Sequence, residues 1–320
     1  MIHNSRILIL VGPTSSGKSE LAVQLAKKFH GEIISADSRQ IYKGMDLGTG
    51  KVPGKWNLSN KSYPTYIYKS IPHHLIDFQN PARQYSASRF QTVARKKIAQ
   101  IIKRGVVPII CGGTAHWIDA VIYNQTLPEV KPNTKLRAKL EKQSAEALFK
   151  RLIRLDPVRA SNIDKFNKRR LIRALEIVIS TGRPVAPLGA VLSSPDASGE
   201  PKGRYPTLWL GVNLPQKDLY QKIDARLKQR FKAGMINEVT QLHKSGLSFK
   251  RLESFGLEYK FISLFLQKKI SREELVIQLS FAIKHYSKRQ MTWWKRNQEI
   301  IWIKPEIKKA IKLTKKFLKS

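Results

Sequence analysis

The chain has 320 residues, which is enough for one large domain or two ordinary ones, and 42% hydrophobic residues allow a substantial core. Its single cysteine, Cys111, excludes an intramolecular disulfide and a cysteine-rich zinc module. The sequence has no apolar run long enough for a signal or membrane-spanning segment, so we expect a cytoplasmic protein that does not act at a membrane.

The charge of the chain is strongly positive, with 59 Lys and Arg against 23 Asp and Glu and a formal net charge of +36. Residues 1–123 carry about +11, residues 124–203 about +8 and residues 204–320 about +17. A distributed excess favours a polyanionic partner that covers a broad surface, and nucleic acid is the first candidate. The alternative is a Lys-rich proteome, because net charge alone says little about a specific partner.

The first part of the chain alternates strands and helices. Apolar runs at 6–12, 31–37 and 106–113 predict buried strands, and periodic apolar residues predict helices over 17–29 and 86–104. Such alternation, with strands that are apolar throughout, is typical of a parallel sheet covered by helices on both faces.

The pattern changes after residue 124. Up to about residue 182 the periodicity is helical only, and the Pro-, Gly- and Ser-rich segment 184–206 predicts an exposed linker. A strand over 207–213 and a long helix ending before Gly234 then return the chain to the sheet. We predict an α/β fold: a P-loop NTPase-like parallel-sheet core of residues 1–123 and 204–320, with helices on both faces, interrupted by an all-helical insertion domain of residues 124–203.

The first strand runs directly into "GPTSSGKS", which fits the phosphate-binding pattern G-x-x-x-x-G-K-[ST]. The glycines let several backbone N–H groups converge on phosphate oxygens at the start of a helix. Lys18 adds a positive charge, and the Ser19 hydroxyl is placed to bind Mg²⁺. The loop that we expect to hold a diphosphate or nucleotide phosphate comprises Gly12, Pro13, Thr14, Ser15, Ser16, Gly17, Lys18 and Ser19.

A nucleotide-hydrolysing enzyme also needs an acid at the end of another apolar strand. The strand over 106–113 ends instead in Gly112 and Gly113, followed by Thr114, without a carboxylate. The acid at a strand end is Asp37, and the carboxyl ends of parallel strands are where sites form. Asp37 is therefore a candidate catalytic base, with a helix-capping or metal-orienting role as the alternative.

Eight segments, "GPTSSGKS", "SADSRQIYKGMDLGTGK", "HHLID", "YSASRF", "GGT", "RRLIRALE", "SFGLEYK" and "KRQMTWWKRN", occur in this order. Together they resemble the tRNA dimethylallyltransferases (the IPP transferase family) from about residue 7 to residue 300. Ala115, His116 and Trp117 after "GGT" depart from the family pattern, as does "SFGLEYK", where the family has a more regular Ile-Gly-Tyr-Lys run.

The resemblance implies a chemistry. Members transfer a dimethylallyl group from dimethylallyl diphosphate to N6 of the adenosine 3′-adjacent to the tRNA anticodon. Asp37 matches the base, while Lys18, Ser19 with Mg²⁺ and Arg226 would carry the diphosphate charge. Independently, Arg226 lies at the margin of an apolar helix face, three residues after Ile223, and can reach inward.

The resemblance also implies contacts with the tRNA anticodon stem-loop. "NKRRLIR" independently places Arg169 and Arg173 four residues apart on one helix face, which suits phosphate contacts, although a solvated helix is the alternative. We expect the protein to act as a monomer. The implied tRNA-binding residues are Asp37, Ser38, Arg39, Gln40, Thr114, Arg137, Arg169, Arg170, Leu171, Ile172 and Arg173.

Three other functions remain to be compared with this one. A P-loop kinase for a nucleotide or small metabolite lacks support, because the strand that ends in "GGT" offers no acid. An adenylate isopentenyltransferase would have no use for a basic helical insertion. An RNA-binding protein with an inactive site is disfavoured by the intact Lys18 and Asp37.

Overall fold

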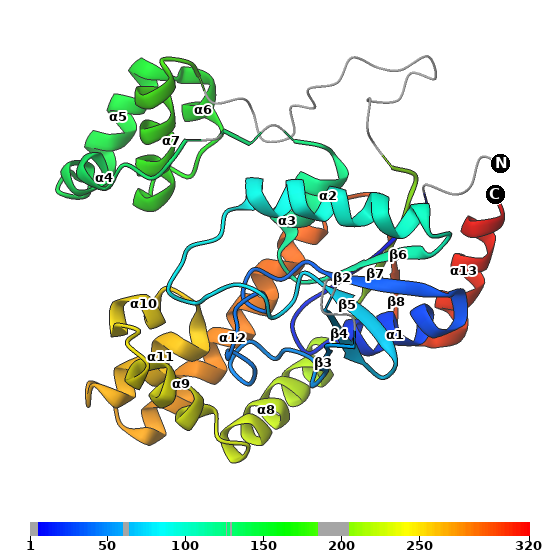
Figure 1. Cartoon of the computed structure of the whole chain (residues 1–320). Coiled ribbons are helices and arrows are strands. Elements are labelled where there is room, and N and C mark those ends of the chain that lie inside the picture. Colours follow the sequence, from blue (N-terminus) through cyan, green and yellow to red (C-terminus); the bar gives the residue numbers. More distant parts are fainter. Residues whose placement is uncertain (1–5, 60–63, 126, 129, 185–204) are drawn as a thin grey trace. The chain divides into compact units, whose positions relative to one another are not determined.

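The chain folds into two compact units, Met1–Ile118 with Tyr205–Ser320, and Asp119–Arg204. The computed structural model describes residues 6–59, 64–125, 127–128, 130–184 and 205–320 (Figure 1). The predicted linker over 184–206 therefore lies almost entirely outside the described residues. The second unit starts within helix α3 (Ala115–Ile122) and not after it, so the boundary that we expected at residue 124 differs slightly from the observed one.

A mostly parallel sheet forms the centre of the first unit. Among the described residues it has eight strands in the order β3-β4-β5-β2-β6-β1-β7-β8. From β5 to β8 each neighbouring pair is parallel. The parallel strands are β1 (Ile7–Val11), β2 (Gly31–Ser35), β5 (Ile71–His74), β6 (Val107–Cys111), β7 (Thr207–Val212) and β8 (Ile300–Ile303). The predicted α/β fold with a parallel core is confirmed.

Strands at both ends of the sheet were not predicted from the sequence: the three strands that precede β2 in the sheet order at one end, and β8 at the other. Strands β3 (Lys55–Asn57) and β4 (Thr65–Tyr68) pair antiparallel with each other, and β4 pairs antiparallel with β5. The side chains of β3 are exposed, and β5 reads Ile-Pro-His-His, so neither strand carries an apolar pattern. Edge strands of this kind are specified by their neighbours and not by local sequence.

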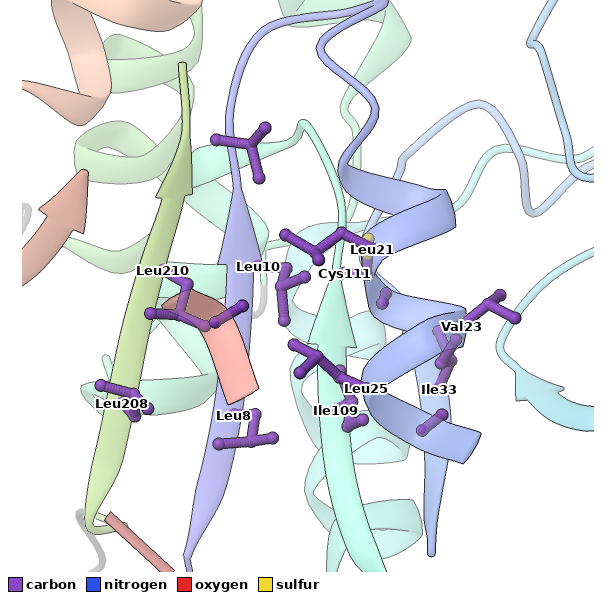
Figure 2. Close-up of a cluster of buried hydrophobic side chains, with 14 of the residues drawn as sticks. Leu8, Leu10, Leu21, Val23, Leu25, Ile33, Ile109, Cys111, Leu208 and Leu210 are labelled. Atoms are coloured by element: carbon purple, nitrogen blue, oxygen red, sulfur yellow. The ribbon is translucent and has the colours of Figure 1, made fainter. Parts of the chain in front are cut away.

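Helices cover both faces of the sheet. Leu8 and Leu10 of β1 pack with Leu21 and Leu25 of α1 (Lys18–Phe29) on one face (Figure 2). The C-terminal helix α13 (Ile307–Lys319) packs on the same face, where Ala310 is fully buried. Because side chains alternate along a strand, the equally buried Ile7 and Ile9 point to the opposite face. There α2 (Ala87–Lys103) contacts β6, and Trp294 of α12 (Arg272–Trp294) lies against Trp209 of β7.

The remaining helices of the first unit lie between β7 and β8 in the chain. They are α8 (Gln216–Lys232), α9 (Met235–Lys244), α10 (Phe249–Glu253), α11 (Leu257–Leu266) and the long α12. Helix α12 begins with a reciprocal capping box between Ser271 and Glu274 and packs against α8 and α11. In the part of the chain that the structure describes, every helix is too short or too polar to span a lipid bilayer.

The second unit is a small helical bundle of α4 (Thr134–Glu141), α5 (Ala145–Leu155), α6 (Pro157–Ser161) and α7 (Lys168–Thr181). Each helix begins with a side chain that accepts a hydrogen bond from the first turn. The capping residues are Asn133, Ser144, Asp156 and Asn167. Leu140, Leu148, Leu152, Leu171 and Leu175 form its fully buried core.

A fully buried carboxylate, Glu176 of α7, joins α4 to α7 in this unit. It accepts hydrogen bonds from the Arg137 Nε and Nη2 at 2.7 and 2.6 Å, from Arg173 Nη1, and from the Asn133 main-chain N–H at 2.7 Å. Burial alone would raise the pKa of Glu176, but the two arginines and the N–H outweigh it and lower the pKa to about 2.

We therefore predict that the second unit loses stability in acid through Glu176. Since the folded-state pKa lies below the ordinary value of 4.5, the carboxylate stabilises the fold above that pH and is lost as the pH falls towards about 2. At neutral pH Glu176→Gln should cost on the order of 3 kcal/mol, and its deficit relative to wild type should shrink as the pH is lowered through this window. Hydrogen exchange of the α4 and α7 amides measures this. A deficit that stays constant down to about pH 3 would contradict the assignment.

Candidate active site

The loop after β1 has the shape of a phosphate-binding loop. Gly12 and Gly17 have φ of 144° and 92°, values that favour glycine, and Ser15 is also left-handed at φ 62°. A Cβ on Gly12 would lie 2.5 Å from the Val212 carbonyl oxygen, so only glycine lets the loop pass the end of β7. Gly17 then starts α1, whose first N–H groups are available to an anion.

Lys18 and Ser19 stand at the start of α1. The Lys18 Nζ donates to the Pro13 carbonyl oxygen at 3.2 Å, across the mouth of the loop. Burial lowers the pKa of Lys18, while Cys111 and Asp37 act in the opposite direction. The buried Ser16 hydroxyl has no hydrogen-bond partner among the described residues. The loop thus keeps a poorly solvated cation and a spare hydroxyl, both suited to an anionic ligand.

A cleft of about 400 Å³ separates the loop from α8. Lys18 and Ser19 line it from one side, and Lys222 and Arg226 line it from the other. Burial lowers the pKa of Arg226 to about 10, and the neighbouring Arg230 acts in the same direction. Three cations face this small volume, so its electrostatics favour a multiply charged anion such as a diphosphate.

Gly50 sets the position of Arg226. Its carbonyl oxygen accepts from Arg226 Nη2 at 3.1 Å and from Gln40 Nε2 at 3.3 Å. A Cβ on Gly50 would overlap the guanidinium groups of both Arg226 and Arg230. Arg230 pairs with Glu258 at 3.2 Å. Burial raises the pKa of that carboxyl, and Arg230 opposes the rise.

Asp37 lies two residues beyond the end of β2. Its Oδ1 accepts from the Arg39 main-chain N–H at 2.9 Å, and its charge acts on the pKa values of both Lys18 and Arg226. The Ser38 N–H donates to the Thr114 Oγ1 at 3.0 Å, which joins the Asp37 loop to "GGT" after β6. The half-buried Asp37 therefore faces the phosphate loop across the carboxyl ends of β1, β2 and β6.

The other residues expected to contact tRNA fall into two groups. Ser38, Arg39, Gln40 and Thr114 surround Asp37 in the first unit. In the second unit, Arg137, Arg169 and Arg173 line a separate cleft of about 500 Å³. Arg170 is exposed beside it, whereas the Leu171 and Ile172 side chains are buried, with 0% and 5% of their surface exposed. Ile172 nevertheless lines the cleft beside the arginines, whereas Leu171 belongs to the core of the bundle.

Several residues of the site were missed in the sequence. Gly50 and Glu258 lie inside the quoted segments "SADSRQIYKGMDLGTGK" and "SFGLEYK", but their chemistry depends on contacts with α8. Gln290, in "KRQMTWWKRN", contacts the phosphate loop itself. The Tyr286 ring also lies near the site, where burial, followed by the charge of Asp37, raises its pKa to about 12. A polar residue at an otherwise apolar helix face is the signal that would have identified Gln290.

Comparison with known proteins identifies close relatives. The model of a family described as IPP transferase matches residues 40–297, and one described as isopentenyl transferase matches residues 5–66. The chain is 37% identical over 310 residues to tRNA dimethylallyltransferase 1 of Syntrophus aciditrophicus, with 96% of each chain covered.

Two solved structures share the fold over most of the chain. One is the full-length tRNA isopentenylpyrophosphate transferase of Bacillus halodurans, with a TM-score of 0.68, 30% identity, and coverage of 99% of this chain and 97% of that one. The other is a eukaryotic dimethylallyltransferase acting on tRNA, with a TM-score of 0.72, 26% identity, and coverage of 94% of this chain and 74% of that one.

The arrangement around Gly50 makes a prediction for anion binding. In Gly50→Ala the two guanidinium groups must move away from the new methyl group, so the affinity for inorganic pyrophosphate should fall about tenfold or more, the loss of one charged hydrogen bond. Isothermal titration calorimetry measures it. Gly105→Ala is the matched control, because Gly105 has a similar φ (71° against 63°) but nothing within 4 Å of the added Cβ. Equal pyrophosphate affinity in the two variants would contradict the role of Gly50.

Proposed function

The chain belongs to the IPP transferase family, and from this premise we propose that it transfers a dimethylallyl group from dimethylallyl diphosphate to N6 of the adenosine 3′-adjacent to the anticodon of tRNA. The products are N6-(dimethylallyl)adenosine and diphosphate. The observation that carries this proposal is the pairing of a phosphate-binding loop after β1 with the carboxylate of Asp37 after β2, while β6, which lies between these two strands in the sheet, is followed by Gly-Gly-Thr. The site thus joins an anion clamp to a base.

The leaving group would be held by the loop and α8. Lys18 and Arg226 lie on opposite sides of the cleft, and both are poorly solvated. As the bond between the allylic carbon and the diphosphate oxygen breaks, its electron pair passes to the diphosphate, and negative charge grows there. Cations fixed in advance stabilise this charge more than they stabilise the bound substrate, and this difference lowers the barrier.

Asp37 would act as the base. The adenine N6 lone pair forms the new bond to the allylic carbon, and the N6 proton passes to the Asp37 carboxylate. The hydrogen bond from the Arg39 N–H to Oδ1 orients the carboxylate and leaves Oδ2 for the proton. Asp37 also lies close enough to Lys18 and Arg226 for its charge to act on their pKa values, so the proposed base and the proposed diphosphate-binding cations belong to one site.

The site would bind Mg²⁺ together with the diphosphate, because the protein itself offers few ligands. No group of three His, Cys, Asp or Glu side chains that could bind a metal exists among the residues described. Mg²⁺ is often held by few protein oxygens together with substrate phosphates, and the Ser19 hydroxyl at the cleft wall offers such an oxygen. When bound, Mg²⁺ would neutralise part of the diphosphate charge.

The tRNA would be held by both units. The Arg137, Arg169 and Arg173 cleft of the helical unit suits the phosphates of an anticodon stem-loop, and Glu176 fixes two of these arginines in place. A base inside a stacked loop cannot reach Asp37, so the adenosine must be extruded before reaction. Ser38, Arg39, Gln40 and Thr114 surround the position where it would arrive.

One assay distinguishes this function from its rivals. The protein is incubated with Mg²⁺ and labelled dimethylallyl diphosphate, with unmodified tRNA, with adenylate, or with ATP and candidate metabolites. We expect label in tRNA at the adenosine beside the anticodon. Label in adenylate alone would identify an adenylate isopentenyltransferase, and phosphorylated metabolites without labelled RNA would identify a kinase. RNA binding without any turnover would identify an inactive site.

Substitution of Asp37 tests the base. Asp37→Asn keeps the shape and the acceptor for the Arg39 N–H but cannot take a proton, so the single-turnover rate should fall about 10²–10⁴-fold with tRNA affinity unchanged. Asp218→Asn, an exposed acid at the start of α8, is the control and should keep the rate. An Asp37→Asn rate within about threefold of wild type would rule out this role.

A further inference from the structure

Gln290 is a buried polar residue on the inner face of α12, with 7% of its surface exposed. Its Oε1 accepts from the Thr14 main-chain N–H of the phosphate loop at 2.9 Å. Its Nε2 donates to the Gly113 carbonyl oxygen after β6 at 3.1 Å. One side-chain amide therefore joins two main-chain segments that are far apart in the sequence, and both segments belong to the site.

The second of these segments continues towards Asp37. Thr114 follows Gly113 directly, and its hydroxyl accepts the Ser38 N–H at 3.0 Å. Ser38 in turn follows Asp37. A continuous series of hydrogen bonds and single peptide steps thus runs from the phosphate loop through Gln290, Gly113 and Thr114 to the loop that carries the proposed base.

The Gln290 amide packs tightly against the main chain at Gly113. A Cβ on Gly113 would lie 2.6 Å from Gln290 Nε2 and 3.9 Å from the Asp37 Oδ2. Gln290 and Asp37 therefore both approach the main chain at Gly113. Helix α12 further holds α8, because Ser280 Oγ and Lys284 Nζ donate to Asp224 at 2.6 and 2.7 Å. Asp224 lies two residues before Arg226, so one helix braces the phosphate loop, the base loop and the arginine helix.

We propose that Gln290 is a positioning residue that fixes the phosphate loop at the distance from Asp37 that prenyl transfer requires. This proposal rests on the proposed function. A buried amide with both of its groups bonded resists displacement, because moving either loop leaves a polar group unsatisfied. In-line transfer from a clamped diphosphate to an amine is sensitive to such displacements, and an error of about 1 Å can cost about 10²-fold in rate.

The test compares Gln290→Met with Gln267→Met. Methionine has nearly the volume of glutamine but makes neither hydrogen bond, and Gln267 is a hydrogen-bonded glutamine of α11–α12 that touches no part of the site. For Gln290→Met we expect kcat to fall about 10–10²-fold, a rise in the Kd of inorganic pyrophosphate, and KM for tRNA within about twofold of wild type. Gln267→Met should keep both kcat and pyrophosphate affinity.

A double-mutant cycle adds a readout that a merely structural role would not move. If Gln290 and Thr114 act in one series of contacts, the kcat losses of Gln290→Met and Thr114→Val should be clearly less than additive when combined. Additive losses, or a Gln290→Met enzyme with kcat within about threefold of wild type, would overturn the proposal. If wild type transfers no label to tRNA, the proposed function fails. The pyrophosphate measurement still tests Gln290 in that case, because a Gln290→Met protein that binds pyrophosphate as tightly as wild type would overturn the role of Gln290 at the phosphate loop.

Discussion

Uncompensated positive charge at the carboxyl ends of the central strands is the constraint on which the site depends. Arg226 and Arg230 repel each other, and burial makes the charges of Lys18 and Arg226 costly. Asp37 and Glu258 offset only part of this. The fold maintains the arrangement with rigid elements, because α8 presents the arginines, Gly50 leaves room for them, and α12 braces both sides. An entering diphosphate would supply the missing negative charge.

The position of the acid separates this site from a nucleotide-hydrolysing one. Both kinds of site begin with the same loop after the first strand. Here β6, the neighbour of β1, ends without a carboxylate, and the acid lies one strand farther, after β2. An acid in that position is away from the centre of the phosphate cleft and faces the space that an incoming nucleophile would occupy. In the proposed reaction the loop would hold the leaving group, and the acid would accept the proton of the nucleophile.

Sequence reasoning was sufficient where the signal is local. The loop after β1 and its flanking strand and helix, and strands β2, β6 and β7, follow from residues adjacent in the chain, and the structure confirms these elements, whereas the apolar strand β8 was missed. Arg226 could be placed because it borders an apolar helix stripe. Strands β3 to β5 were missed because each has only three or four residues, and β3 and β5 have no apolar pattern, so their pairing with neighbouring strands decides their structure.

Long-range contacts explain the rest. Gln290 acts on a residue 276 positions away, and the role of Gly50 depends on Arg226, 176 positions later. One sequence does not reveal the partner of either residue, although the polar Gln290 on an apolar helix face is a local signal that the position is unusual. Leu171 and Ile172 show the opposite case. The family resemblance implied that they contact tRNA, but in the structure their side chains belong to the hydrophobic core of the second unit.

The most direct test of the central claim, that the loop holds the leaving group of the prenyl donor, is a product count. Pyrophosphate released and prenylated adenosine formed are measured in the same reaction, with tRNA and dimethylallyl diphosphate, in the presence and absence of ATP. We predict one pyrophosphate for each prenylated adenosine, with no need for ATP and no release of orthophosphate from it. A reaction that depends on ATP hydrolysis, or pyrophosphate release that does not match prenyl transfer, would contradict the account.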